Sequence, residues 1–205
     1  MTSDNFKIVQ TQLPEVKCFI PEVRIDPRGA FWEEFDIEVY REALGLEDIK
    51  ILKVNGSFSP HGMLRGLHHQ LNKPQGKLIT VTNGAVHDIA LDIRVGSPTF
   101  GRYASYHLSR DNKAVLYIPP GFAHGFLALK ADTTMRYSIT TNMYHPKDEQ
   151  GIHWNDRELG LDWPLHQLSA GAPEMNHRDA AWPTLEEARQ RGLLPTYQAP
   201  LHPAQ

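Results

Sequence analysis

The stretch GKLITVTNGAVHDIALDI, residues 76–93, decides the fold class of this chain. Two runs rich in β-branched and other apolar residues flank Asn83 and Gly84, and Asn-Gly is the preferred dipeptide of a two-residue type I′ hairpin turn. We therefore predict two antiparallel strands in which Lys77 faces Ala90.

Alternation along these two strands divides their side chains between two faces. One face carries Lys77, Ile79, Val81, Val86, Asp88, Ala90 and Asp92, and the more apolar face carries Leu78, Thr80, Ile89, Leu91 and Ile93. Lys77 is diagonal to Asp88 and Asp92, and on the pattern alone a surface ion pair is the simplest interpretation.

Short apolar segments separated by Gly, Pro and Asn continue through the middle of the chain, at residues 49–58, 114–121, 125–129 and 135–141. Many short strands with frequent turn signals are typical of an all-β sandwich or barrel. We expect a mainly β protein.

Two short helices are expected to flank these strands. Asp36 is a typical N-cap, and the helical pattern after it ends at Gly45. Thr184 is the N-cap of a second helix with Glu186 and Glu187 in its first turn, where acidic residues stabilise the helix dipole.

Composition narrows the class of protein. The chain has 205 residues, a formal net charge of −3 and one cysteine, Cys18, so an internal disulfide is excluded. Interspersed charges make a nucleic-acid partner unexpected, and no apolar run approaches membrane-spanning length. We expect a soluble, cytoplasmic protein with one domain over residues 1–185, followed at 186–205 by a helix end and a mobile tail.

The segment MLRGLHHQ, residues 63–70, raises the question of a metal site. Small double-stranded barrels that bind iron or manganese need three or four ligands, but the neighbours His68 and His69 point to opposite faces of a strand. No carboxylate follows in residues 70–73, and His124 adds just one imidazole. We therefore predict no metal, and a metal-dependent barrel enzyme stays as the less favoured alternative.

Arg65 and His68 have opposite parity on a regular strand. If both face one ligand, the strand must bulge, and Gly66 between them permits this.

Seven collinear motifs identify a family. They are DPRGAFWEEF (26–35), MLRGLHHQ (63–70), QGKL (75–78), DIRVGSPTFGRY (92–103), IPPGFAHGF (118–126), HWNDRELGLDWP (153–164) and RDAAWP (178–183). Over about residues 5–185, the chain closely resembles the dTDP-4-dehydrorhamnose 3,5-epimerase family. The resemblance implies a jelly-roll (cupin) double-stranded barrel with short flanking helices, assembled as a homodimer and using no metal or other cofactor.

The resemblance also implies a reaction, in which a proton α to the ketone of a dTDP-4-keto-6-deoxyhexose leaves one face of the ring and is replaced from the other. Four residues match the family's catalytic positions: His68 as base, Asp179 orienting it, Tyr137 as proton donor on the far face, and Lys77 near O4. A cation near O4 would stabilise the enolate, so the resemblance replaces the surface ion pair of Lys77 with a catalytic role.

Further matches imply contacts with the nucleotide. Arg28 and Arg65 correspond to residues that clamp the diphosphate, and Tyr144 corresponds to the aromatic residue that stacks on thymine. Glu33, Asn55, His124, Glu149 and Arg178 match other substrate contacts. In the family, some of these contacts come from the partner subunit.

The expected activity is epimerisation at C3 and C5, from dTDP-4-dehydro-6-deoxy-D-glucose to dTDP-4-dehydro-L-rhamnose. The chain departs from the family at Lys53 and Met143, has one extra residue within 138–146, and places Asp179 farther after Trp163 than is usual. These departures leave open an epimerase acting at C3 only or on another nucleotide. A non-catalytic protein that binds sugar nucleotides is the alternative from a different class.

Overall fold

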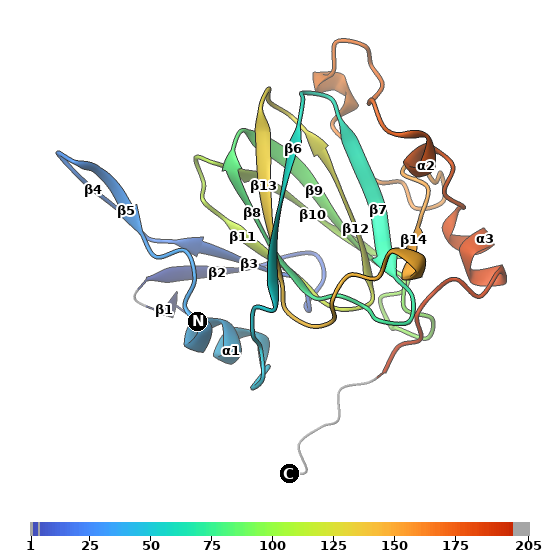
Figure 1. Ribbon diagram of the computed structural model, residues 1–205, viewed down its shortest axis with the longest axis horizontal. Helices are drawn as coiled ribbons and strands as arrows, with labels where there is room; N and C mark the ends of the chain where they lie inside the picture. Colours follow the sequence, from blue (N-terminus) through green and yellow to red (C-terminus); the bar gives the residue numbers. More distant parts are fainter. Residues whose placement is uncertain (1, 4, 199–205) are drawn as a thin grey trace.

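Two antiparallel sheets face each other in the computed structural model, which describes residues 2–3 and 5–198 (Figure 1). The larger sheet holds, in spatial order, β1 (Thr2–Ser3), β2 (Phe6–Gln10), β3 (Lys17–Pro21), β11 (Val115–Ile118), β8 (Lys77–Asn83), β13 (Thr133–Ile139) and β6 (Lys53–Ser59). The smaller sheet holds β10 (Tyr103–Ser109), β9 (Ala85–Asp92), β12 (Phe122–Ala128), β7 (Leu64–Gln70) and β14 (Glu149–Gly151). The mainly β, two-sheet class predicted from the sequence is confirmed.

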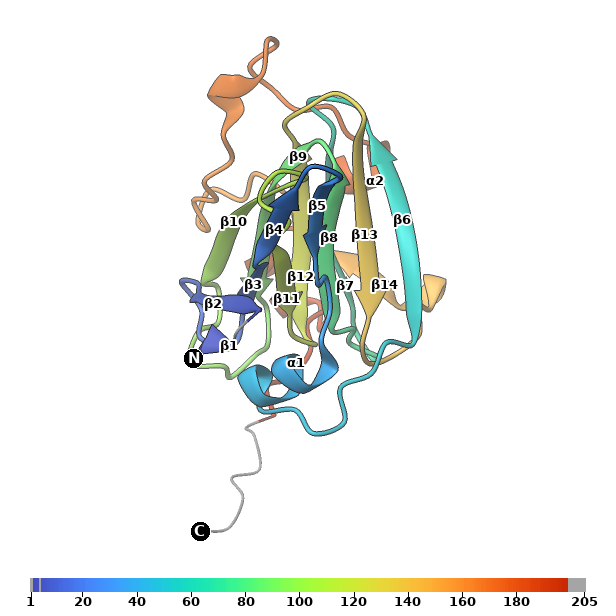
Figure 2. The ribbon, with the colours of Figure 1, turned by 90° about the vertical axis from the view of Figure 1, so that its left-hand side faces the viewer.

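A separate hairpin of β4 (Val23–Asp26) and β5 (Gly29–Trp32) projects away from the barrel (Figures 1 and 2). The helical elements are α1 (Ile37–Leu44), η1 (Pro146–Asp148), η2 (Leu165–Gln167), α2 (His177–Ala180) and α3 (Leu185–Gln190). None of the helices in the described part of the chain is long and apolar enough to span a membrane.

The hairpin predicted at Asn83 and Gly84 is wrong. β8 pairs with β11 and β13, whereas β9 pairs with β10 and β12, so Lys77 and Ala90 are not partners. A type I′ turn requires a positive φ at both central residues, and here Gly84 has one (77°) but Asn83 does not. The chain instead crosses at Gly84 from one sheet to the other, close against Thr133, where a Cβ atom would lie 2.4 Å from the Thr133 hydroxyl.

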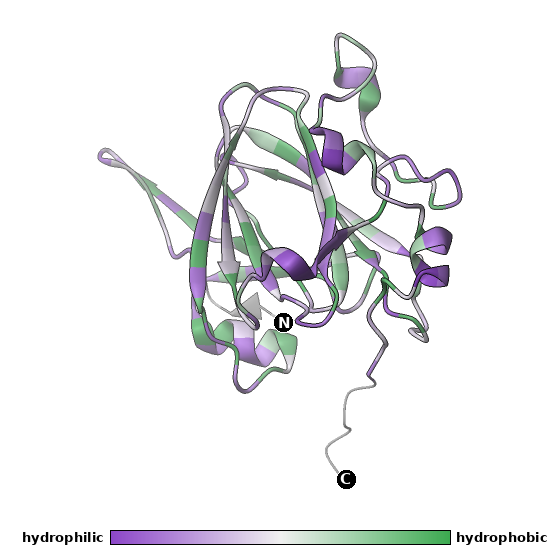
Figure 3. Ribbon diagram, turned by 45° about the vertical axis from the view of Figure 1, so that its right-hand side comes forward, coloured by the Kyte–Doolittle hydropathy of each residue, from purple (hydrophilic) through white to green (hydrophobic). Residues whose placement is uncertain are grey.

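The predicted division into faces nevertheless holds, because alternation does not depend on the partner strand. Ile79 and Ala90 lie in the core between the sheets together with Cys18, while Ile89 and Leu91 lie in a second core on the outer face of the smaller sheet. Hydropathy correspondingly changes from residue to residue along the barrel strands (Figure 3).

A third core joins the larger sheet to α1. Tyr40 of this helix is fully buried and stacks on Phe19 with their ring centroids 4.0 Å apart. The predicted caps are confirmed: Asp36 accepts hydrogen bonds from two backbone N–H groups of the first turn, and Gly45 ends the helix with a φ of 65°.

The C-terminal segment covers the outer face of the smaller sheet. Thr184 caps α3 in a capping box with Glu187, which confirms the predicted N-terminus. Beyond α3, the backbone N–H of Tyr197 donates to the carbonyl of Val95 at 2.9 Å. The end of the tail predicted to be mobile, residues 199–205, lies outside the described residues.

Candidate active site

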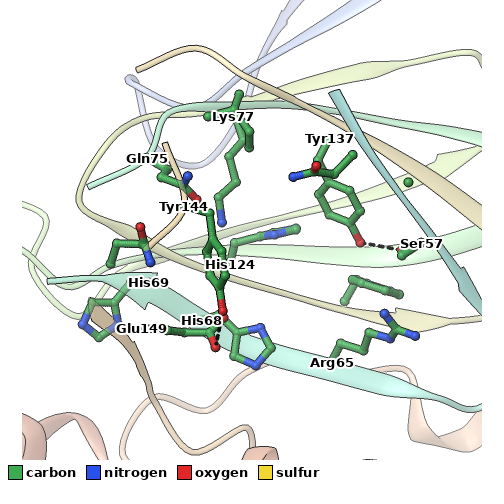
Figure 4. A pocket seen from close by; sticks show the side chains of 15 residues that line it. Ser57, Arg65, His68, His69, Gln75, Lys77, His124, Tyr137, Tyr144 and Glu149 are labelled. Carbon is green, nitrogen blue, oxygen red and sulfur yellow. Dashed lines mark hydrogen bonds between the residues drawn. The ribbon is translucent and has the colours of Figure 1, made fainter. Parts of the chain in front are cut away.

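A cavity of about 250 Å³ opens between the two sheets (Figure 4). Its lining comes from β7, β12 and β14 of the smaller sheet, from β6, β8 and β13 of the larger sheet, and from two loops. The lining residues are Asn55, Gly56, Ser57, Arg65, His68, His69, Gln70, Gln75, Lys77, His124, Phe126, Tyr137, Ile139, Tyr144 and Glu149. Three of the four predicted catalytic residues are among them, and the fourth, Asp179, lies behind His68.

His68 lies on β7 and is held by Asp179 of α2, with 2.7 Å between His68 Nε2 and Asp179 Oδ1. Asp179 is fully buried, and its second oxygen accepts a hydrogen bond from the Gly66 N–H at 3.0 Å. Burial alone would raise the pKa of Asp179, but these hydrogen bonds hold it below its ordinary value. The ionised carboxylate is an acceptor only, so Nε2 of His68 carries a proton and Nδ1 is the ring nitrogen able to take one.

A β-bulge explains how Arg65 and His68 reach the same cavity. On β12, His124 pairs with His68 and Phe126 pairs with Arg65, so three steps along β7 oppose two along β12. Gly66, with a φ of 119°, lies at this irregularity, and a Cβ atom there would lie 2.6 Å from the backbone of Gly125. The predicted bulge at Gly66 is confirmed.

Lys77 extends from β8 into the cavity (Figure 4). Burial lowers the pKa of its ammonium group to about 8, although Glu149 and Asp88 favour the charged form. Lys77 makes no ion pair within 4 Å in residues 2–3 and 5–198, so the surface pair suggested by the strand pattern is wrong.

Tyr137 enters the cavity from β13, on the sheet opposite His68. Its hydroxyl lies 2.9 Å from the hydroxyl of Ser57 on β6 and 3.7 Å from the sulfur of Met135. Burial raises the pKa of Tyr137 to about 12, so the phenol keeps its proton at neutral pH.

His124 and Asp88 form a buried pair at the wall of the cavity. Nε2 of His124 lies 2.9 Å from Oδ2 of Asp88, and both side chains are nearly inaccessible to solvent. The other carboxylate oxygen of Asp88 has no hydrogen-bond partner among the described residues. The pair brings a fixed acidic group close to Lys77 and Tyr137.

Charged and aromatic residues form one rim of the cavity. Arg178 pairs with Glu149 at 2.5 Å, and the Tyr144 hydroxyl donates to the same carboxylate at 3.2 Å. Tyr144 remains 44% exposed, so its ring is free to stack against a planar ligand. Asn55 lines the cavity from β6.

Arg28 and Glu33 are not brought to the cavity of their own chain. Arg28 lies at the tip of the β4–β5 hairpin, where its guanidinium pairs with Asp26 and its side chain is 89% exposed. Glu33 accepts a hydrogen bond from Asn5 at 2.9 Å. A role of either residue at the cavity therefore requires a second chain.

Comparison with known proteins decides the family. Residues 10–187 match the profile of the dTDP-4-dehydrorhamnose 3,5-epimerases. The chain belongs to this family.

Individual relatives agree with this epimerase assignment. The dTDP-4-dehydrorhamnose 3,5-epimerase of Methanothermobacter thermautotrophicus is 40% identical over 182 residues, which cover 89% of this chain and 96% of the relative. A crystal structure of the dTDP-6-deoxy-D-glucose-3,5-epimerase from Legionella pneumophila, in complex with dTDP-4-keto-L-rhamnose, superposes with a TM-score of 0.86. It is 43% identical, with 95% of this chain and 100% of that chain covered.

A 3′-monoepimerase from Streptomyces bikiniensis, in complex with dTDP-quinovose, is also similar. Its TM-score is 0.83 at 33% identity, with 93% of each chain covered. Likeness to these epimerases confirms the jelly-roll class, since their barrels superpose on nearly the whole chain.

Ser57 and Gln75 line the cavity although neither is predicted as a site residue from the sequence. Ser57 could have been found by alternation, because it shares a strand face with Asn55. His69 also borders the cavity, but its Nε2 lies 2.9 Å from the carbonyl of Leu193, and it is buried. Within residues 2–3 and 5–198, no group of three or more His, Cys, Asp or Glu side chains could hold a metal ion.

Proposed function

We propose that this protein catalyses epimerisation at C3 and C5 of a dTDP-4-keto-6-deoxyhexose, converting dTDP-4-dehydro-6-deoxy-D-glucose to dTDP-4-dehydro-L-rhamnose without a cofactor. One observation carries the proposal: His68 and Tyr137 enter one cavity from opposite sheets. Inversion of a carbon needs a base on one side of the sugar and an acid on the other. Family membership supports the same reaction.

The proposed mechanism begins with proton removal. Nδ1 of His68 takes the proton α to the ketone, and Asp179 stabilises the imidazolium that forms. The electron pair of the broken C–H bond moves to O4, where the ammonium of Lys77 stabilises the enolate. Tyr137 then delivers a proton to the opposite face of the same carbon, and its O–H bond breaks as the new C–H bond forms.

The remaining cavity residues are proposed to bind substrate. Arg65, next to the base on β7, suits the diphosphate, because a guanidinium can donate two parallel hydrogen bonds to phosphate oxygens. Tyr144, Glu149 and Arg178 at the rim suit the nucleotide base. Asn55 and His124 fall within reach of a sugar in the cavity.

We further propose a homodimer in which the hairpin of one subunit completes the cavity of the other. Arg28 and Glu33 lie outside the cavity of their own chain, and Phe31 on the same hairpin is 68% exposed. An exposed apolar side chain beside charged groups is typical of a protein interface. The single free thiol, of Cys18, fits a reducing compartment, and we propose the cytoplasm.

Solvent exchange tests the proposed reaction. The keto sugar nucleotide is incubated with enzyme in D₂O, and NMR follows deuterium at C3 and C5. We expect deuterium at both carbons, whereas deuterium at C3 alone would identify a 3-epimerase, and no deuterium at either carbon would refute the proposal.

Two variants test the assigned roles. We expect His68→Ala to abolish exchange, because it removes the proposed base, and Tyr137→Phe to permit exchange but impair inversion. His166→Ala, at an exposed histidine outside the cavity, is the control and should behave as wild type. Full turnover by both cavity variants would contradict the mechanism.

A further inference from the structure

Ser57 has no place in the mechanism so far, yet it lies against the acid. On the edge strand β6, Asn55 pairs with Tyr137 and Ser57 pairs with Met135, so Ser57 and Tyr137 are diagonal neighbours on the same face. Their hydroxyl oxygens are 2.9 Å apart, and both side chains line the cavity (Figure 4).

The contacts of the phenol determine what Ser57 can do. Among the described residues, the Tyr137 oxygen has one other polar contact, the Met135 sulfur at 3.7 Å, and a thioether can only accept. The ring of His124 is 6.2 Å away between centroids, and its Nε2 is engaged by Asp88. Ser57 is therefore the side chain in this part of the molecule that is placed to donate to the phenol oxygen.

Ser57 is also free to donate. Its hydroxyl makes no second hydrogen bond within residues 2–3 and 5–198. Ser59, two residues farther along the same strand, is buried, and its hydroxyl has no hydrogen-bond partner in the described part of the chain. Of these two serines on one face of β6, Ser57 lines the cavity and contacts Tyr137, whereas Ser59 is not among the lining residues and has no hydrogen bond to Tyr137.

We propose that Ser57 is the positioning residue of Tyr137: its O–H donates to the phenol oxygen, so that the phenolic proton faces the sugar, and it stabilises the phenolate left after proton transfer. The inference rests on the proposed epimerase reaction. When the Tyr137 O–H bond breaks, its electron pair stays on oxygen, while the proton forms the new C–H bond. The phenolate then accepts the Ser57 hydrogen bond until water returns a proton.

Burial explains why such a donor matters. The phenolate forms in a cavity that already holds the carboxylate of Asp88, and both burial and this charge raise the pKa of Tyr137. A hydrogen bond to a charged group in such surroundings is stronger than one between neutral groups. Loss of the Ser57 hydroxyl should slow the Tyr137 step by about 10- to 100-fold.

The experiment compares Ser57→Ala, Ser57→Thr and Ser57→Val. Thr keeps the hydroxyl and Val replaces it with a methyl group of similar size, so any general effect of a branched side chain on the strand is common to both. We expect Ala and Val to lower the rate of inversion by about 10- to 100-fold while deuterium exchange through His68 stays within about twofold of wild type. Thr should restore inversion to near the wild-type rate, and Ser59→Ala should change neither rate.

Epistasis shows whether Ser57 acts through Tyr137. In a Tyr137→Phe background, Ser57→Val should cause no further loss of inversion, because the group that it serves is already absent. A further loss in that background, equal losses of exchange and inversion, or unchanged inversion in Ser57→Val would each overturn the proposal. A wild-type enzyme that neither exchanges nor inverts would instead refute the epimerase function itself.

Discussion

At the scale of single residues, the protonation state of Lys77 can be tested directly by the pH dependence of activity. Its folded-state pKa of about 8 lies below the ordinary value of 10.5, because burial disfavours the ammonium ion. The proposed mechanism needs the charged form beside O4. The free enzyme should therefore lose activity as the pH rises through about 8.

The loss of activity at high pH, the alkaline limb of the pH profile, gives a prediction for Lys77. The pH profile of kcat/KM, which reports the free enzyme, should fall above about pH 8 in the wild type. Lys77→Arg keeps its charge at high pH and should move the limb upward, while Lys77→Met should lower kcat by about 100-fold or more. An unchanged limb in Lys77→Arg would assign it to another group.

Lys77 also links activity to stability. Between about pH 8 and 10.5 the unfolded chain binds a proton at this lysine that the folded chain does not, so the free energy of unfolding should rise with pH across this window. For the same reason Lys77→Met should not destabilise the protein at pH 7. Thermal unfolding of both forms provides the measurement.

At the scale of elements, β7 carries two adjacent histidines with different surroundings. His68 lines the cavity, whereas Nε2 of His69 bonds the carbonyl of Leu193 in the C-terminal segment. Burial lowers the pKa of His69 to about 4, so this ring stays neutral at physiological pH. The strand that carries the proposed base is thus hydrogen-bonded, through His69, to the chain beyond α3.

The bond between His69 and Leu193 leads to a prediction about stability at acidic pH. The unfolded chain binds a proton at His69 below pH 6.5, whereas the folded chain does so only near pH 4. The free energy of unfolding should therefore fall by up to about 3 kcal/mol as the pH drops through this window. His69→Gln, which keeps an N–H donor but does not titrate, should flatten the profile in urea unfolding. The exposed control His166→Gln should leave the slope unchanged.

Elements also show what the sequence can and cannot predict. The caps at Asp36 and Thr184 were predicted correctly because capping depends on a few adjacent residues. The turn at Asn83 and Gly84 was not, because the same dipeptide permits either a hairpin or a crossing between sheets, and the choice depends on distant partners such as Thr133.

The same distinction, between features set by adjacent residues and features set by distant partners, applies to the candidate site. The bulge that brings Arg65 and His68 together could be inferred from one glycine between them. The approach of Asp179 to His68, across 111 residues, could not be derived from local patterns, because it depends on α2 packing against β7. The family resemblance alone suggested it.

At the scale of the whole molecule, the proposed dimer makes a prediction about shared sites. If the hairpin of one subunit enters the cavity of the other, each site takes His68 from one subunit and Arg28 from its partner. Arg28→Ala and His68→Ala then damage residues that different subunits contribute to the same site. Half of the dimers in an equal mixture are mixed, and each mixed dimer has one intact cavity. Co-expressed variants that are each inactive should recover about a quarter of the wild-type activity.

The matched control is an equal mixture of subunits that carry His68→Ala and subunits that carry Lys77→Met. Both residues belong to the cavity of their own chain, so no mixed dimer has an intact site and no activity should return. Absence of recovery in the Arg28 mixture, with mixed dimers verified by mass spectrometry, would show that the hairpin does not serve a partner.

The burial of Cys18 in the core between the sheets has a practical consequence for such work. Desolvation raises the pKa of its thiol to about 12, so the nucleophilic thiolate is nearly absent at pH 7 to 8. Maleimide reagents should therefore spare the native chain. A cysteine introduced at the exposed hairpin tip would be the single labelling point, and a fluorophore there could report subunit association without removal of the natural cysteine.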